Sequence, residues 1–244
     1  MPEILYNRLI NKNNSEISGT CSGAVQPQME VSMENSIITI SREYGSGGRE
    51  IARKTAERLG IPFYDRDLID KAAQESGFTP EFVAEREQRL GNNFLYNFAL
   101  GGIYGLAYPR KPEMKELPVA EQIFLAQKKV IEDLAEQGPC IFVGRCADYI
   151  LRNKPKILKV FIYADPKERV SRSIEKYGQM AEQAEELIRH IDKQRRLHYE
   201  AYTVQEWGDR NNYHLMLDSQ AFGVEGCVDI ICGAVLSLDK KPSP

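Results

Sequence analysis

The chain has 244 residues, of which 42% are hydrophobic and 27% charged, a composition typical of a globular protein. Its net charge of −3 and isoelectric point of about 5.8 disfavour a nucleic-acid polymer or a membrane surface as a general partner, because such binders are usually basic. The five scattered cysteines lack C-x-x-C spacing, and the three histidines form no metal-binding pattern. Without a signal-peptide core or a run near the ~18 apolar residues of a membrane span, we expect a cytoplasmic protein.

Two parts of unequal length are expected. Residues 1–34 are polar with little hydrophobic periodicity, which predicts a disordered N-terminal tail. Residues 35–240 then alternate apolar runs and turn signals, and we interpret them as one domain.

The first half of this domain is expected to begin with a strand at 36–41, a glycine loop at 42–48, a helix at 49–59 and a strand at 61–64. Helices at 66–76 and 79–90 and a long loop at 91–117 should follow. The second half is expected to hold a helix at 119–137, strands at 140–143 and 157–163, and helices at 166–177 and 180–199. An irregular segment at 200–212, a strand at 213–217 and a helix at 223–237 should complete it. Alternating strands and helices predict an α/β fold with a mainly parallel sheet. The loop at 91–117 is interpreted as a lid-like insertion, because loops of that length are often functional.

Glycines, arginines and carboxylates follow three of the predicted strands. Ligands of parallel sheets bind outside the carboxyl ends of the strands, so these residues are candidates for one site. They are Arg42, Gly45, Ser46, Gly47 and Gly48 after the first strand, Asp65 and Arg66 after the second, and Gly144 and Arg145 after the third. A glycine cluster by itself is more often a turn, but between a strand and a helix such glycines let backbone N–H groups surround a phosphate.

The glycine loop departs from the common phosphate-loop pattern. G-x-x-x-x-G-K-[ST] is absent, because no lysine follows the glycines, and G-x-G-x-x-G is absent too, which disfavours dinucleotide binding. Arg49 is the nearest cation after the glycines, and either Arg49 or Arg42 could replace the lysine.

The helix predicted at 180–199 carries a second candidate group. Arg189, Asp192 and Arg196 share one helix face at i, i+3 and i+7, and Arg195 flanks them. One interpretation is a solvated face with an Asp192–Arg196 pair. The other is a lid whose arginines clamp a phosphoryl group in transfer, since that reaction depends on positioning and charge neutralisation.

Four segments carry a family resemblance: residues 37–52, 60–66, 123–127 and 138–150. On these segments the chain resembles the cytidylate kinase-like family over about residues 36–236. The resemblance implies a three-layer, P-loop kinase-like fold of the nucleoside-monophosphate-kinase type, with a five-stranded parallel sheet, a helical monophosphate-binding insertion and an arginine-bearing lid.

The resemblance also implies roles for individual residues. Gly45 to Gly48 match the phosphate loop, Asp65 lies near the monophosphate-binding segment, Gly144 and Arg145 match a motif that holds the monophosphate, and Asp192 and Arg195 match the lid. We therefore expect Arg42 and the loop from Gly45 to Gly48 to bind the nucleotide phosphates. We expect Asp65, Arg66, Gly144, Arg145 and Asp192 to bind the acceptor, and Arg49, Arg189, Arg195 and Arg196 to act in catalysis.

The expected reaction is ATP-dependent phosphoryl transfer to a nucleoside monophosphate, with CMP or dCMP as the first expectation. The expected cofactors are ATP and Mg²⁺, the metal ligands are not identified, and the partner is a small-molecule nucleotide. Two alternatives stay open: a nucleotide-binding protein without catalysis, and a kinase for a non-nucleotide acceptor.

Overall fold

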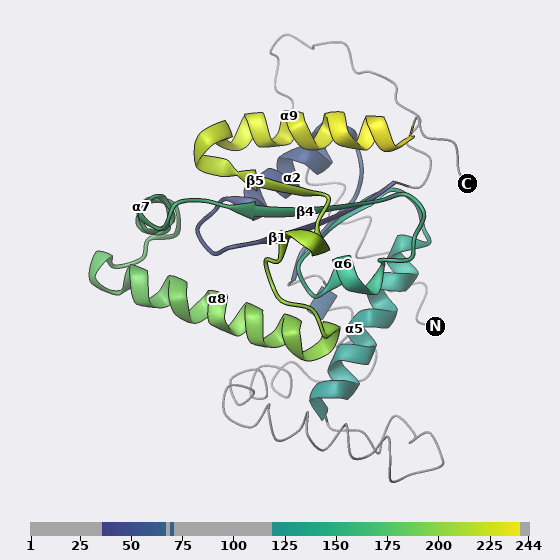
Figure 1. The fold of residues 1–244 in the computed structure, drawn as a ribbon, viewed down its shortest axis with the longest axis horizontal. Helices are drawn as coiled ribbons and strands as arrows, with labels where there is room; N and C mark the ends of the chain where they lie inside the picture. The colour runs from purple at the N-terminus through teal and green to yellow at the C-terminus, as the bar shows by residue number, and fades with distance from the viewer. Residues whose placement is uncertain (1–35, 67–68, 71–118, 240–244) are drawn as a thin grey trace. The chain divides into compact units, whose positions relative to one another are not determined.

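A computed structural model describes residues 36–66, 69–70 and 119–239, shown as a ribbon in Figure 1. The tail predicted at 1–34, the helix predicted at 79–90, the long loop at 91–117 and most of the helix predicted at 66–76 lie outside the described residues.

The centre of the fold is a five-stranded sheet in which every pair of neighbouring strands is parallel. The strands are β1 (Ile37–Arg42), β2 (Phe63–Tyr64), β3 (Cys140–Val143), β4 (Ile157–Tyr163) and β5 (Leu215–Asp218), in the order β2-β3-β1-β4-β5. The first strand lies in the middle, where Ile38 pairs in register with Ile141 of β3 and Leu158 of β4. The predicted parallel sheet is confirmed.

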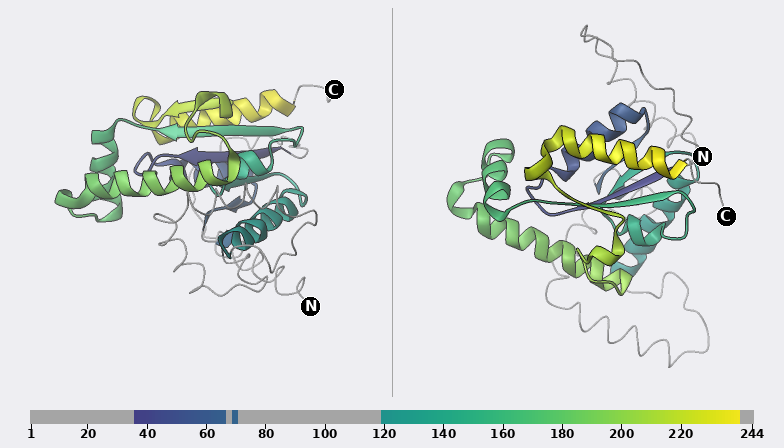
Figure 2. Two further views of the ribbon diagram at one scale, coloured as in Figure 1. Left: turned by 60° about the horizontal axis from the view of Figure 1, so that its bottom comes forward. Right: turned by 45° about the horizontal axis from the view of Figure 1, so that its top comes forward.

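Helices cover both faces of this sheet (Figures 1 and 2). They are α2 (Gly48–Leu59), α5 (Val119–Ala135), α6 (Ala147–Ile150), α7 (Pro166–Tyr177), α8 (Ala181–Thr203) and α9 (Ser219–Asp239), together with the 3₁₀ turn η2 (Arg210–Asn212). α2 and α9 lie on one face and α5, α6 and α8 on the other, so the predicted three-layer α/β architecture is confirmed.

The core follows from the apolar runs in the sequence. Because parallel strands are covered on both faces, β1 and β3 are continuous hydrophobic runs, and Ile38, Ile40 and Phe142 are fully buried. α7 begins as expected at Asp165-Pro166, where the Asp165 carboxylate accepts a hydrogen bond of 2.8 Å from the Lys167 amide.

Element boundaries differ from the predictions where side chains cap the backbone. α8 runs to Thr203, four residues beyond the predicted end, and the Thr203 hydroxyl donates to the Tyr199 carbonyl at 2.7 Å. α9 starts at Ser219 instead of 223, because the Asp218 carboxylate accepts a hydrogen bond from the Gln220 amide at 2.9 Å. The backbone of α9 is non-helical at Gly223, where the helix is kinked. The four-residue helix α6 was not predicted.

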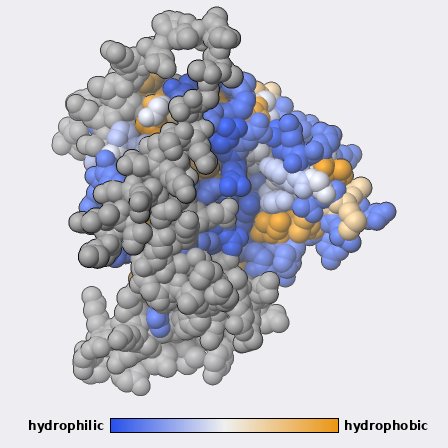
Figure 3. All heavy atoms as spheres, turned by 180° about the vertical axis from the view of Figure 1, so that it is seen from behind, coloured by the Kyte–Doolittle hydropathy of each residue, from blue (hydrophilic) through white to orange (hydrophobic). Residues whose placement is uncertain are grey.

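α9 is apolar over most of its length. Among the described residues, α9 is a helix whose length and composition would allow it to cross a membrane. No apolar run of that length was expected from the sequence. In this fold α9 packs on α2, with Cys227, Val228 and Ile231 fully buried. Arg58 of α2 pairs with Glu225 at 2.9 Å and also with Asp229. The face in Figure 3 is mainly hydrophilic over the described residues, with small separate apolar patches.

Ser219 joins α9 to the glycine loop, because its buried hydroxyl donates to the Ser46 carbonyl at 2.7 Å. We expect Ser219→Ala to lower the free energy of unfolding by about 1–3 kcal/mol, because a buried carbonyl loses its donor. Ser237→Ala is the control, since that hydroxyl is exposed and donates to Gly233 within the same helix. Urea unfolding of both variants measures the effect, and equal stability in the two would contradict the proposed link.

Candidate functional site

The glycine loop connects β1 to α2 at the carboxyl edge of the sheet. Gly45 and Gly47 have φ angles of 80° and 76°, which side chains rarely adopt, and the Ser46 hydroxyl donates to the Glu43 carbonyl at 2.9 Å. This turn brings the chain directly into α2, whose first-turn N–H groups have no partner inside the helix. Such amides at a helix N-terminus suit an anion.

Four glycines of this region lie so close to arginines that a side chain on the glycine would not fit. A Cβ atom built on any of them would come closer to arginine atoms than normal van der Waals contact. The pairs are Gly45 with the Arg169 backbone, Gly47 with the Arg172 guanidinium, Gly48 with the Arg42 stem, and Gly144 with the Arg42 guanidinium. The glycines therefore let α7 and β1 deliver arginines to the loop.

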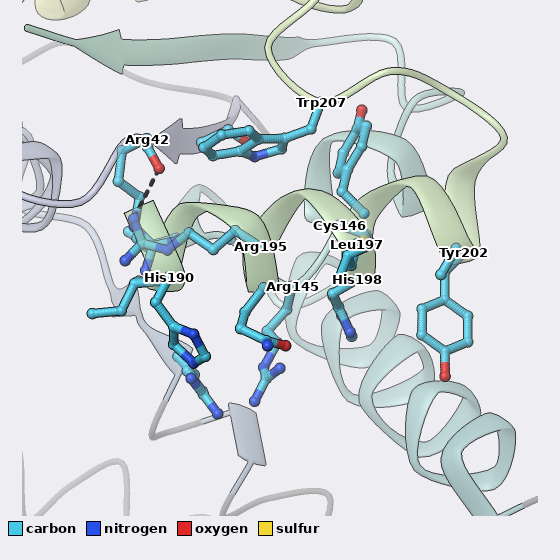
Figure 4. A pocket seen from close by; sticks show the side chains of 17 residues that line it. Arg42, Arg145, Cys146, His190, Arg195, Leu197, His198, Tyr202 and Trp207 are labelled. Atoms are coloured by element: carbon cyan, nitrogen blue, oxygen red, sulfur yellow. Dashed lines mark hydrogen bonds between the residues drawn. The ribbon is translucent and has the colours of Figure 1, made fainter. Parts of the chain in front are cut away.

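Asp192 fastens α8 to the glycine loop. Its carboxylate accepts from the Tyr44 amide at 2.8 Å, from Arg169 Nη1 at 2.5 Å and from Arg195 Nη1 at 3.4 Å. Arg195 Nη1 also donates to the Arg42 carbonyl at 3.1 Å, the dashed line in Figure 4. Asp192 thus joins arginines from two helices to the loop, instead of forming the Asp192–Arg196 pair considered from the sequence.

A pocket of about 480 Å³ opens beside the loop, between the carboxyl ends of β1 and β3 and the inner face of α8 (Figure 4). Its lining includes the arginines Arg42, Arg66, Arg145 and Arg195 and the histidines His190 and His198. Tyr199, Tyr202 and Trp207 add aromatic surface to the same lining. This combination suits an anionic small molecule with a planar or apolar part.

The electrostatics of the pocket favour a bound anion. Burial, followed by the neighbouring Arg195, Arg145 and Arg66, lowers the pKa of Arg42 well below its usual range. Burial also lowers the pKa of Arg195, which Asp192 partly offsets. An anion would add the negative charge that these neighbouring guanidinium groups need.

Arg145 is held in place by its backbone and by Asp70. Arg145 and Cys146 have φ angles of 53° and 56°, a conformation that costs of the order of 1–3 kcal/mol per residue and clusters at functional sites. The Arg145 side chain is only 7% exposed and pairs with Asp70. Asp70 also accepts from Gln127 Nε2 at 3.0 Å and lies 3.4 Å from Arg66 Nε.

A buried hydrogen bond supports the far side of the pocket. The Tyr199 hydroxyl of α8 donates to the Asp148 carboxylate of α6 at 2.7 Å, and burial raises the pKa of Asp148. Further along α8, the Tyr202 ring stacks on Phe124 of α5 with ring centroids 4.1 Å apart. These contacts fix the position of α8, which carries Arg195 of the lining.

Three arginines expected to act in catalysis do not line this pocket. Arg49 has an exposed side chain that pairs with Asp65 and is absent from the lining. Arg189 is 70% exposed and pairs with Glu185 at 2.9 Å within α8. Arg196 is exposed, with its guanidinium carbon 5.9 Å from the centroid of the Trp207 ring. Of the four, Arg195 alone is in the lining.

Other residues enter the site that the sequence did not assign to it: Arg169, Arg172, Asp70, His198 and Trp207. The first two had a usable signal, since they lie at i and i+3 in the helix that follows β4. The other three had none, because only tertiary packing brings them to the carboxyl edge of the sheet.

The described part of the chain, residues 36–66, 69–70 and 119–239, contains no group of three or more His, Cys, Asp or Glu side chains able to hold a metal ion. Near the loop, Glu50 pairs with Arg172 at 3.0 Å, and Glu43 lies 3.4 Å from Arg169 Nε.

His198 provides a pH test of the pocket. Burial, then Arg145 and Arg66, lowers its pKa to about 3. The unfolded chain, with a histidine pKa of about 6.5, therefore binds this proton more tightly than the folded protein, so the free energy of unfolding should fall as the pH drops from about 7 to about 4.

In His198→Gln this part of the fall should disappear, whereas His190→Gln, at an exposed position of the same helix, should retain it. Denaturant unfolding across this pH range measures it. Identical pH profiles in wild type and His198→Gln would contradict the assigned burial.

Comparison with known proteins identifies the family and a shared fold. The model of the Cytidylate kinase-like family matches residues 37–221. A cytidylate kinase from Archaeoglobus fulgidus is 28% identical over 212 residues, which cover 84% of this chain and 99% of that protein. The crystal structure of an uncharacterized protein from Eubacterium ventriosum shares the fold, with 24% identity, a TM-score of 0.62 and coverage of 84% and 99%. Since the family model spans most of the sequence, the chain belongs to the cytidylate kinase-like family.

Proposed function

We propose that this protein transfers the γ-phosphoryl group of ATP to a nucleoside monophosphate, with CMP or dCMP as the first expectation. The observation that carries the proposal is a pocket lined by four arginines directly beside a glycine loop at the carboxyl edge of a parallel sheet. The name of the Archaeoglobus relative supports the choice of cytidylate. We also propose that the protein acts in the cytoplasm on small molecules.

The glycine loop is the proposed donor site. The first-turn amides of α2 and the backbone curl at Gly45 and Gly47 suit the oxygens of a polyphosphate. The Arg172 guanidinium lies over Gly47, so it adds positive charge at the same place. A magnesium ion bound with ATP would neutralise further charge on the donor oxygens.

The arginine pocket is the proposed acceptor site. Arg42, Arg66, Arg145 and Arg195 would surround a monophosphate dianion, and guanidinium groups bind phosphate oxygens through paired hydrogen bonds. A pocket of about 480 Å³ falls within the usual range for small-molecule sites, which leaves space for the nucleoside.

Catalysis would then consist of positioning and charge stabilisation. Asp192 holds Arg169 and Arg195 against the loop, so cations lie between the two proposed sites. Closure of the proposed lid over the site would exclude water from the phosphoryl group during transfer. Arg49, Arg189 and Arg196 stay in the proposal only as residues that could approach in another arrangement of the lid.

One observation favours a second candidate function. Gly48 stands at the lysine position of the phosphate-loop pattern, which supports a nucleotide-binding protein without catalysis. The decisive experiment measures ADP release from ATP and Mg²⁺ with CMP, dCMP, UMP, AMP and GMP offered separately. Turnover with one or two of them supports the kinase, whereas ATP binding without any turnover supports the second candidate.

Arg145 is the sharpest test of the acceptor site. We expect Arg145→Ala to raise the KM for the monophosphate about 10- to 100-fold, because a hydrogen-bonded charge contributes about 1.5–3 kcal/mol. Arg152→Ala is the control, since that arginine stacks on Tyr149 at 3.9 Å outside the pocket. Steady-state kinetics and thermal melting of both variants measure it, and unchanged KM in folded Arg145→Ala would remove the assignment.

Gly144 gives an independent test through Arg42. In Gly144→Ala the new methyl group would displace the Arg42 guanidinium, while in Gly178→Ala it would meet nothing within 4 Å. Both glycines have positive φ, 76° and 67°, so both variants should lose about 1–2 kcal/mol of stability. Only Gly144→Ala should also weaken acceptor binding, and equal kinetics in the two variants would contradict this.

A further inference from the structure

The loop departs from G-x-x-x-x-G-K at two positions, not one. Aligning Gly47 with the second glycine of the pattern puts Arg42 where the first glycine stands and Gly48 where the lysine stands. A cation has thus been lost at the end of the loop and gained at its beginning. The sequence alone leaves these as two separate changes.

The structure shows that the two positions share one space. A Cβ atom on Gly48 would lie 2.6 Å from Arg42 Cβ, 2.9 Å from Arg42 Cγ and 3.4 Å from Ile162 Cβ. Arg42 Cβ is bonded directly to the backbone of β1, so it cannot swing away as the end of a flexible side chain could. Gly48 is the first residue of α2, so it is space, not backbone conformation, that requires glycine here.

From Gly48 the Arg42 side chain continues into the acceptor pocket. Its Nη1 atom reaches Gly144, and its guanidinium lines the pocket with Arg145 and Arg195, as Figure 4 shows. The stem therefore contacts the donor loop while the charge faces the acceptor site. This is the place where a phosphoryl group in transfer would lie.

The other arginines near the loop occupy different places. Arg49 is 62% exposed and pairs with Asp65. Arg172 lies over Gly47 and pairs with Glu50 at 3.0 Å. Neither side chain lines the pocket between the loop and α8.

We propose that Arg42 performs the work of the missing phosphate-loop lysine, and that Gly48 is small because the Arg42 stem fills the space that a lysine would need. The inference rests on the proposed function. In the transfer, an acceptor phosphate oxygen bonds to the γ-phosphorus while the bond from that phosphorus to the β,γ-bridging oxygen breaks. Arg42 keeps its protons throughout and neutralises charge on the phosphoryl oxygens.

The charge is tested with Arg42→Met, which keeps an unbranched stem against Gly48 and removes the guanidinium. We expect kcat with the best monophosphate to fall about 10²- to 10³-fold, the usual loss when a transition-state donor is removed. Arg53→Met is the control, because Arg53 is exposed on α2 and pairs with Glu57. A folded Arg42→Met variant with kcat within threefold of wild type would overturn the charge assignment. If kcat were also lost in Arg49→Met, the work of the lysine would belong to Arg49.

The shared space is tested by a double-mutant cycle that needs no activity. Gly48→Ala should lower the melting temperature, because its methyl group collides with the Arg42 stem. In the Arg42→Gly background the same change should no longer destabilise, since the space is empty and alanine favours a helix. Equal destabilisation in both backgrounds would overturn the spatial part of the proposal.

A last pair of variants restores the common pattern. Gly48→Lys alone should lose turnover, because lysine meets the Arg42 stem, while Arg42→Gly with Gly48→Lys should recover at least tenfold over that single variant. No recovery in a folded double variant would overturn the exchange.

If wild type turns over no monophosphate, the proposed function fails, and calorimetric ATP binding then decides the loop assignment. Binding at least tenfold weaker in Arg42→Met than in Arg53→Met supports the assignment, and equal binding overturns it.

Discussion

Close contact between glycines and arginines is the constraint on which the site depends. Where Gly45, Gly47 and Gly48 curl between β1 and α2, the absence of side chains lets Arg169, Arg172 and the Arg42 stem approach to contact distance. The loop therefore serves two purposes: its amides suit an anion, and its bare backbone admits cations from neighbouring elements. α7, α8 and the sheet are joined at this point.

Carboxylates orient the arginine side chains around the site. Asp192 holds two guanidinium groups beside the loop, and Asp70 holds Arg145 beneath the pocket. Both acids are largely buried, so they orient arginines by hydrogen bonds in a medium less polar than water, where such bonds are stronger. The depressed pKa of Arg42 follows from the same crowding of like charges, after burial. The two carboxylates thus hold arginines of the pocket in fixed positions.

Much of the fold could be predicted from the sequence, and less of the site. Short apolar runs identified all five strands, and their alternation with helices predicted the parallel sheet and its carboxyl edge, where the glycine loop and Arg145 lie. The sequence could not predict which arginines of α8 line the pocket. Arg189 and Arg196 share a face by spacing, but the face that packs toward the pocket carries Arg195 and His198. Spacing defines the faces of a helix, but only its neighbours determine which face is buried.

The overlap between the Arg42 stem and Gly48 also bears on how such a loop could arise. If Arg42 performs the work of the lysine as proposed, an ancestor with glycine and lysine at these positions would meet a cost at either single step. Introducing arginine first would crowd the lysine, and losing the lysine first would leave the loop without its cation. On this proposal the two residues form an epistatic pair, separated from the common form by a fitness valley. A lineage that has crossed it is expected to keep both residues, and a motif search that requires lysine would overlook its members.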